Sequence, residues 1–290
     1  MMGRAVIGVD LGGTNVRSGH LVDGRITRVD SRPISSRGTQ EAVLQDLIHS
    51  IEAIMTPDVG AIGIGVPAVV DTRQGIVYDV QNIPSWHEVP LRALLEQHFG
   101  VPVLVNNDAN CFAAGEWYYG RAKGYQDVVG LILGTGVAAG LICNNQLYEG
   151  RNCGAGEFGM LPYLEHNLEF YASGNYFRHF HHLSGEEVFN RARTGDPDAL
   201  QIFHEYGRHV SMVVRAVLFA MDPQIIILGG SVSKAYPYFE KSLWHHLQDF
   251  PYRPVIQNIK IEPSEAENIA IYGAAALHLG SGPTDANGTL

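Results

Sequence analysis

The chain has 290 residues, of which 46% are apolar and 17% are charged, and its formal net charge is -10. This balance is that of a globular protein, and the length allows two domains of roughly 100–200 residues with a core that needs no disulfide or metal. The acidic charge argues against a general nucleic-acid binder and a polybasic membrane-surface protein, because both need a basic face. Glycine is the unusual component, with 33 residues.

Cysteine usage and hydropathy bear on the compartment. The three cysteines are an odd number without a paired framework, as expected of reduced thiols. No apolar run approaches the roughly 18 residues of a membrane-spanning helix, and the first apolar stretch, at 5–9, is too short for the core of a signal peptide. We therefore expect a cytoplasmic protein with no nucleic-acid or membrane partner.

The first part of the chain predicts strands and hairpins, followed by alternating strands and helices. Strands are expected at 4–11, 16–22, 26–34, 59–66 and 101–105, and helices at 40–55, 91–99 and 109–119. The strands are β-branched and apolar, whereas the first helix has apolar residues near helical spacing. This order predicts a mixed sheet covered by helices.

The pattern then restarts. A strand–glycine turn–strand unit at 127–143 echoes the one at 4–22, which suggests two related halves. Further helices are expected at 186–192, 199–221, from 231 onward and at 269–279, and further strands at 224–228 and 259–261. Residues 281–290 have the composition of a disordered tail.

Three predicted strands end in glycine turns, with the sequences DLGGTN at 10–15, LGTGVAAG at 133–140 and LGGSVS at 228–233. A turn without Cβ atoms lets backbone N–H groups approach an anion closely. Thr14, Thr135 and Ser231 add hydroxyl donors. One such turn is a weak signal, but three at strand ends in one chain favour a nucleotide phosphate site.

Two common nucleotide-binding patterns do not account for these turns. The chain has no G-x-x-x-x-G-K-[ST] motif, which excludes a P-loop ATPase. Gly134, Gly136 and Ala139 fit G-x-G-x-x-A, but that dinucleotide motif must open a helix. Here the residues after the turn have only strand length before the next turn, at 144–145. Phosphate held in hairpin turns, twice in one chain, points to another nucleotide fold.

At these motifs the sequence resembles the sugar kinases of the ROK (repressor, open reading frame, kinase) family, within the hexokinase–actin superfamily. The resemblance covers nearly the whole chain through IGVDLGGTN, IGIGVPAVVD, VNNDANCFAAGE, LILGTGVAAGLI, GAGEFG, LEFYASG and IILGGSVS. It implies an α/β fold of the actin-like ATPase (ribonuclease H-like) type, with ATP and sugar bound in an interdomain cleft.

The resemblance also implies a domain arrangement and an oligomer. Residues 1–118 with 270–280 would form the smaller α/β domain and residues 119–269 the larger one, and the family suggests a homodimer. Repressors of the family add an N-terminal DNA-binding domain. Because this chain begins directly at the first phosphate strand, we expect no such domain.

The resemblance assigns the chemistry to Asp108, which matches the family's catalytic aspartate. It would accept the proton from the sugar hydroxyl, normally on carbon 6, as that oxygen attacks the γ-phosphate. The plainer interpretation of Asp108 is the N-cap of the following helix, and both roles can hold. Positions that match sugar-contacting residues are Asn82, Asn107, Glu157 and Glu169.

The resemblance also implies which residues bind the phosphates and the metal. Asp10 would lie near Mg²⁺ and the phosphates. The residues that would cradle the phosphates are Gly12, Gly13, Thr14, Asn15, Gly134, Thr135 and Gly136, and Gly229 and Gly230 would lie under the adenosine.

One departure from the family is large. Zinc-containing members have a histidine and a cysteine-rich loop where this chain has Met160 and only eight residues, without cysteine, before Glu169. Since structural zinc needs its four ligands, we expect no structural zinc. Met160 also replaces a histidine that contacts the sugar in relatives, which leaves the identity of the sugar open.

The leading hypothesis is an ATP-dependent, Mg²⁺-dependent hexose kinase of the glucokinase type, acting on the 6-hydroxyl of glucose or a close relative. A first alternative is a kinase for N-acetylmannosamine, N-acetylglucosamine, fructose or allose. A second is a non-catalytic, sugar-sensing regulator.

Overall fold

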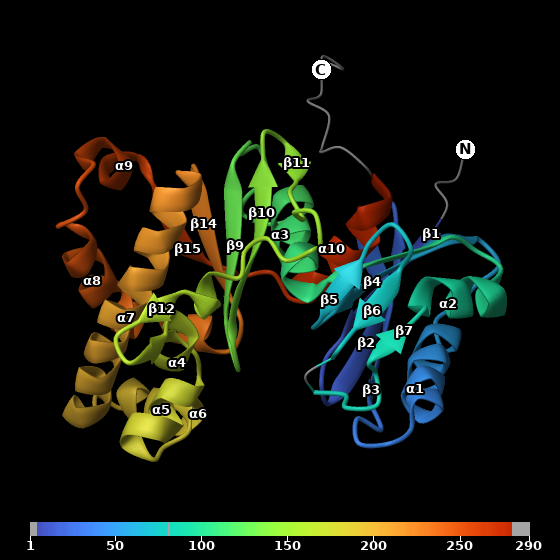
Figure 1. Cartoon of the computed structure of the whole chain (residues 1–290), viewed down its shortest axis with the longest axis horizontal. Coiled ribbons are helices and arrows are strands. Elements are labelled where there is room, and N and C mark those ends of the chain that lie inside the picture. The colour runs from blue at the N-terminus through green and yellow to red at the C-terminus, as the bar shows by residue number, and fades with distance from the viewer. Residues whose placement is uncertain (1–4, 81, 280–290) are drawn as a thin grey trace. The chain divides into compact units, whose positions relative to one another are not determined.

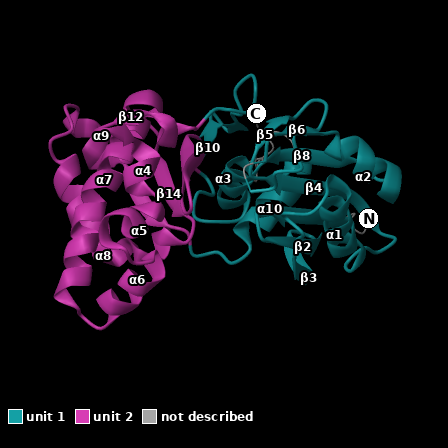
Figure 2. Cartoon of the chain, turned by 60° about the horizontal axis from the view of Figure 1, so that its bottom comes forward, with its two compact units in different colours: residues 1–124, 140–155, 265–290 teal, residues 125–139, 156–264 magenta. Residues whose placement is uncertain are grey.

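The computed structural model describes residues 5–80 and 82–279, so the tail expected at 281–290 lies outside the described residues. The chain divides into two compact units (Figure 2): unit 1 comprises residues 1–124, 140–155 and 265–290, and unit 2 comprises residues 125–139 and 156–264. Residues 140–155, assigned to the larger domain from sequence, fall in unit 1 by their contacts. The functional domain boundaries stay a prediction. Within 5–80 and 82–279, none of the helices has the length and apolarity to traverse a bilayer.

Unit 1 is built on a five-stranded sheet of order β3-β2-β1-β4-β8. Its strands are β1 (Ala5–Leu11), β2 (Asn15–Val22), β3 (Arg25–Pro33), β4 (Val59–Val66) and β8 (Val103–Asn107). The first three form antiparallel hairpins, whereas β1, β4 and β8 are parallel. β8 starts later than expected and includes Asn106 and Asn107, because both pair with β4 in the ladder.

Helices cover both faces of this sheet (Figure 1). α1 (Gln40–Glu52) and α2 (Leu91–Phe99) share a core with Ile7 and Ile62, which point to one face. α3 (Asp108–Tyr118) and α10 (Ile269–Ala276) lie on the other face. A small sheet of β5 (Val69–Asp71), β6 (Ile76–Tyr78) and β7 (Glu88–Val89) precedes α2 in the chain.

On the face that carries α10, the helix backbone approaches two glycines of the sheet so closely that no side chain would fit at those positions. A Cβ atom on Gly63 would lie 1.8 Å from the carbonyl oxygen of Ala274, and one on Gly8 would lie 2.0 Å from that of Ile271. α10 meets α3 in the same manner, since a Cβ on Gly273 would lie 1.6 Å from the carbonyl oxygen of Cys111. This packing fixes α3 against the sheet.

The second sheet has the order β11-β10-β9-β14-β15. Its strands are β9 (Val128–Leu133), β10 (Val137–Cys143), β11 (Gln146–Leu147), β14 (Ile225–Gly229) and β15 (Lys260–Pro263). β9, β14 and β15 are parallel, as β1, β4 and β8 are in the first sheet. The unit boundary at residues 139 and 140 falls within β10. The repeated succession of strands agrees with the two related halves expected from sequence.

Unit 2 carries the remaining helices and a short hairpin. These are η1 (Phe158–Met160), β12 (Pro162–Tyr163), β13 (His166–Asn167), α4 (Leu168–Ala172), α5 (Asn175–His181), α6 (Gly185–Arg193), α7 (Pro197–Met221), η2 (Val232–Ala235), α8 (Tyr236–Leu247) and α9 (Arg253–Asn258), while η3 (Leu277–Leu279) follows α10 in unit 1. α7 is capped by Asp196, whose side chain accepts from the N–H groups of Asp198 and Ala199. Phe239 of α8 packs on Tyr206 of α7.

We expect Gly63→Ala to lower the free energy of unfolding by about 1–3 kcal/mol or more, because the added methyl group overpacks the contact with α10. Denaturant unfolding followed by circular dichroism measures this. Gly154→Ala is the control: a Cβ there meets no atom within 4 Å, so its effect should stay within about 0.5 kcal/mol. Equal losses in the two variants would show that close approach is not the constraint.

Candidate functional site

At one edge of the unit 1 sheet, where the parallel strands β1, β4 and β8 end, two predicted carboxylates come together. In the strand register Asp10 of β1 pairs with Gly65 of β4, which pairs with Asn106 of β8. Asp108 follows two residues later as the first residue of α3. A Cβ on Gly65 would lie 3.5 Å from the Cα of Asp108. Because neighbouring strands lie about 4.8 Å apart, Asp10 and Asp108 share this edge.

The N-cap of α3 is Asn107, so the interpretation of Asp108 as the N-cap is wrong. The Oδ1 of Asn107 accepts from the N–H of Ala109 at 2.8 Å, and its Nδ2 donates to the carbonyl of Ala68 at 3.2 Å. Asp108 occupies the first turn, where its Oδ1 also accepts from the N–H of Ala109, at 2.9 Å. The helix dipole favours an ionised carboxylate at this position.

The first glycine turn contacts a residue predicted to bind sugar. Within the turn, the N–H of Gly12 donates to the carbonyl of Asn15 at 2.9 Å, and Thr14 and Asn15 are exposed. A Cβ on Gly13 would lie 2.5 Å from the Cβ of Asn82. Unit 1 therefore brings the predicted phosphate turn against the predicted sugar residue Asn82.

The carboxyl group of Asp10 has the chemistry of a cation ligand. Burial raises the pKa of Asp10, and the charge of Arg17, its partner in the β1–β2 ladder, opposes this shift only in part. A nearby Mg²⁺ would favour the charged form, and Mg²⁺ prefers carboxylate oxygens. Asp10 therefore fits the predicted Mg²⁺. In the described part of the chain, no three His, Cys, Asp or Glu residues are clustered so as to hold a metal, and the lack of zinc stays a prediction.

In unit 2, Glu169 lies against the second glycine turn. Its Oε2 accepts from the N–H of Val137 at 2.9 Å, and a Cβ on Gly136 would lie 2.6 Å from that oxygen. The N–H of Gly174 donates to the carbonyl of Gly134 at 2.6 Å. As in unit 1, a residue predicted to bind sugar contacts the turn predicted to bind phosphate.

Glu157 lies at the start of η1 and is held there by the backbone beside it. Gly156 has a φ of 95°, and a Cβ on it would lie 1.8 Å from the carbonyl oxygen of Ala139. Although the side chain of Glu157 is exposed, the loss of part of its hydration and, secondarily, the charge of Glu169 raise the pKa of Glu157. Two mutually repelling carboxylates therefore lie in unit 2. Met160, at the other end of η1, is 49% exposed.

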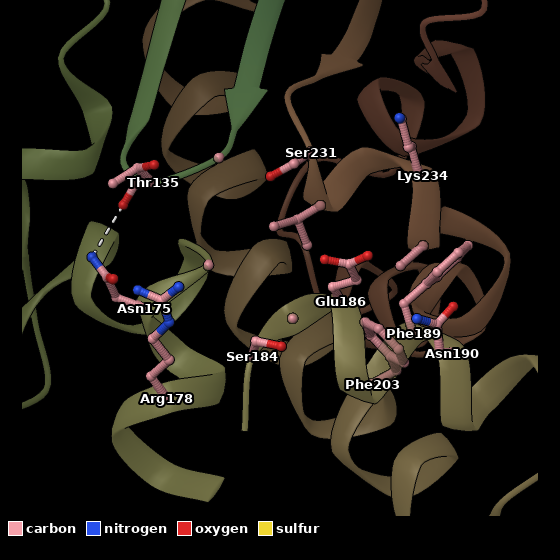
Figure 3. Close-up of a pocket in the computed structure, with 15 residues that line it drawn as sticks. Thr135, Asn175, Arg178, Ser184, Glu186, Phe189, Asn190, Phe203, Ser231 and Lys234 are labelled. Carbon is pink, nitrogen blue, oxygen red and sulfur yellow. Dashed lines mark hydrogen bonds between the residues drawn. The ribbon is translucent and has the colours of Figure 1, made fainter. Parts of the chain in front are cut away.

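A pocket with a volume of about 520 Å³ opens beside the second glycine turn (Figure 3). Thr135 of that turn and Ser231, which follows β14, line it, and Nδ2 of Asn175 donates to the carbonyl of Thr135 at 3.2 Å. The other side chains come from α5, α6, α7 and η2, and they include Arg178, Ser184, Glu186, Phe189, Asn190, Phe203 and Lys234. The volume is within the range of small-molecule sites.

The sequence did not identify most of the residues that line this pocket. Arg178 and Glu186 lie in helices without a recognisable motif, and only the packing of those helices brings them together, whereas Lys234 directly follows the IILGGSVS motif. Asn175 could have been found, because it directly follows the LEFYASG motif. Gly230, predicted to lie under the adenosine, is not among the residues that line this pocket, whereas the next residue, Ser231, is. The φ of Gly230 is 84°, and a Cβ on it would lie 2.3 Å from the carbonyl oxygen of Leu133, so the lack of a side chain lets this turn approach the end of β9.

Comparison with known proteins identifies the family. The profile described as the ROK family matches residues 6–280, and the chain therefore belongs to the ROK family. It is 29% identical to the glucokinase of Thermotoga maritima, over 94% of this chain and 96% of that protein. It is 30% identical to the N-acetyl-D-glucosamine kinase of Pectobacterium atrosepticum, over 94% of this chain and 98% of that protein.

The fold agrees with this membership. The crystal structure of a ROK family glucokinase from Streptomyces griseus in complex with glucose and AMPPNP superposes with a TM-score of 0.81 at 28% identity, covering 94% of this chain and 98% of that one. The expected family and the expected α/β fold of the actin-like ATPase type are thus confirmed.

We expect Glu157→Gln to raise the melting temperature at pH 8 but not near pH 4.5. A raised pKa means that the folded state binds the proton more tightly than the unfolded state, so stability falls as pH rises above the ordinary value of 4.5. The neutral amide removes this loss. Calorimetry of both proteins at the two pH values measures it. Glu165→Gln, in the exposed hairpin turn, is the control, and an equal gain there would contradict the assignment.

Proposed function

We propose that the chain is an ATP-dependent hexose kinase that transfers the γ-phosphate to the 6-hydroxyl of glucose or a close relative. The observation that supports this best is the edge of unit 1, where Asp10 and Asp108 lie at neighbouring strand ends and the glycine turn after Asp10 contacts Asn82. Phosphoryl transfer needs a carboxylate to orient the nucleophile and groups that neutralise phosphate charge. The activities named for its ROK relatives agree with this proposal.

In this reaction Asp108 accepts the proton of the sugar hydroxyl as that oxygen attacks the γ-phosphate. Its place in the first turn of α3 puts it where the helix dipole favours negative charge, and the cap formed by Asn107 holds the backbone from which it projects. Bound Mg²⁺, for which Asp10 is the ligand at hand, would supply neutralisation of phosphate charge.

The remaining residues bind and orient the two substrates. Backbone N–H groups of the glycine turns meet the phosphates, and the adenosine occupies the pocket of unit 2, where Phe189 offers a ring and Arg178 a positive charge. Asn82, Asn107, Glu157 and Glu169 hold sugar hydroxyls. The interdomain cleft, the homodimer and the cytoplasmic location stay predictions.

A kinase for another hexose is the second candidate. The N-acetyl-D-glucosamine kinase of Pectobacterium atrosepticum is as similar to the chain as the glucokinase of Thermotoga maritima is. Met160 also stands where zinc-containing relatives have a histidine that contacts the sugar. Replacing a hydrogen-bonding ring by a thioether changes which sugar substituents can be recognised there.

A coupled ATPase assay over glucose, N-acetylglucosamine, N-acetylmannosamine, fructose and allose tests the proposal. We expect the highest kcat/KM with glucose. The highest value with another sugar would select the second candidate. Tight sugar binding by calorimetry, without turnover of any sugar, would contradict a kinase and favour a sugar-sensing regulator.

We expect Asp108→Asn to lower kcat by about 10²–10⁴-fold, because the amide cannot accept the proton, while the dissociation constant for the sugar changes little. Steady-state kinetics with the preferred hexose and calorimetric titration measure the two quantities. Asp249→Asn, on an exposed residue of unit 2, is the matched control and should keep full turnover. Near-normal turnover of Asp108→Asn would remove Asp108 from the mechanism.

A further inference from the structure

The buried amide of Asn106 connects the backbone before Asp108 to a distant loop. Asn106 is 3% exposed. Its Oδ1 accepts from the N–H of Asn107 at 2.8 Å, from Nδ2 of Asn110 at 2.9 Å and from the thiol of Cys153 at 3.4 Å. Its Nδ2 donates to Oε1 of Glu149. Both ends of one side-chain amide are therefore used.

Glu149, together with the N–H of Asn107, fixes which way this amide points. An ionised carboxylate only accepts hydrogen bonds, so it selects the Nδ2 end of Asn106. The reverse orientation would set Oδ1 of Asn106 against the carboxylate and Nδ2 against two donors, the N–H of Asn107 and Nδ2 of Asn110. Glu149 is itself held, because its Oε2 accepts from the hydroxyl of Thr72 at 3.0 Å.

The orientation of Asn106 matters because its Oδ1 accepts a hydrogen bond from the backbone N–H of Asn107. The N–H of Asn107 is the last backbone donor before Asp108, and the side chain of Asn107 caps α3 and donates to the carbonyl of Ala68. The backbone that leads into Asp108 is thus tied at residue 107 by three hydrogen bonds. A rotation of the Asn106 amide would release the first of them.

The loop that carries Glu149 has a second attachment to the same amide. Cys153 is buried and has a φ of 53°, which is uncommon for a residue other than glycine. Burial raises the pKa of its thiol, which keeps the thiol protonated as a donor to Asn106. The carbonyl of Glu149 also accepts from the N–H of Ala155 at 3.2 Å. A strained residue persists when its surroundings hold it, and Asn106 with Asn110 does so here.

We propose that Glu149 is a positioning residue for Asp108, which it acts on by locking the amide of Asn106. This inference rests on the proposed kinase function. The side chain of Glu149 bonds to Asn106 and Thr72, and no motif marks it. Its effect should appear in the rate of phosphoryl transfer more than in sugar binding, because three of the four residues predicted to bind sugar, Asn82, Glu157 and Glu169, have no bond to the Asn106 amide.

Glu149→Ala should lower kcat about 10–100-fold, as expected when a reacting group is misplaced, with the sugar KM nearly unchanged. Glu149→Gln should recover most of the rate, because its Oε1 can accept from Asn106 and its Nε2 can donate to the hydroxyl of Thr72. Glu52→Ala, which removes an exposed glutamate paired with His98, is the matched control and should keep full turnover.

A double-mutant cycle separates positioning from a general loss of structure. In the Asp108→Asn background, Glu149→Ala should lower the residual single-turnover rate by less than about 2-fold, because the group it positions is gone. An undiminished 10–100-fold loss in that background would overturn the proposal, as would full activity of Glu149→Ala alone.

Separate measurements distinguish a variant that fails to fold, and a protein without kinase activity, from a failure of this inference. If Glu149→Ala does not fold, Glu149→Asp, whose carboxylate is withdrawn by one methylene, replaces it in the same cycle with the same expectation. A wild-type protein that phosphorylates no hexose would overturn both the proposed function and this inference. An active wild type with an active Glu149→Ala would overturn this inference alone.

Discussion

The close approach of α3 and α10 to the first sheet is the constraint on which the unit 1 site depends. Gly8 and Gly63 allow the backbone of α10 to touch the strands, and Gly65 allows the first turn of α3 to lie beside β4. With side chains at these positions the helices would stand farther from the sheet, since protein interiors are already close-packed. Asp108 would then no longer share the strand edge with Asp10. Some of the chain's many glycines thus serve packing rather than phosphate binding.

The elements that the sequence predicted best are those with a strong pattern and clear ends. β4 and β10 are apolar strands with a turn residue directly at an end, Pro67 after β4 and Gly136 before β10, and α2 has helical periodicity. The strands β5–β7 and β12–β13 were missed because two or three residues carry no period. The end of β8 was misplaced because Asn106 and Asn107 are polar, while their ladder partners lie in a distant strand.

The site divides in the same way between local and tertiary information. Motifs located the glycine turns and the carboxylates, because each motif is a continuous segment whose chemistry is visible in its residues. They could not show that Asn107 rather than Asp108 caps α3, since the choice depends on hydrogen-bond geometry between neighbouring residues. They also could not reveal Arg178 or Glu149, because residues brought together from separate elements leave no pattern in the chain.

Each unit sets one residue predicted to bind sugar against its glycine turn: Asn82 against Gly13, and Glu169 against Gly136 and Val137. Under the proposed function, a sugar whose hydroxyls drew either side chain toward them would also move the adjoining glycine turn, and with it the backbone N–H groups that bind the phosphates. Because protein interiors are close-packed, moving one side chain in such a contact displaces the backbone that it touches. Such turns bind phosphate through backbone dipoles and Mg²⁺, so they need no basic surface. A net charge of -10 is therefore compatible with a nucleotide substrate.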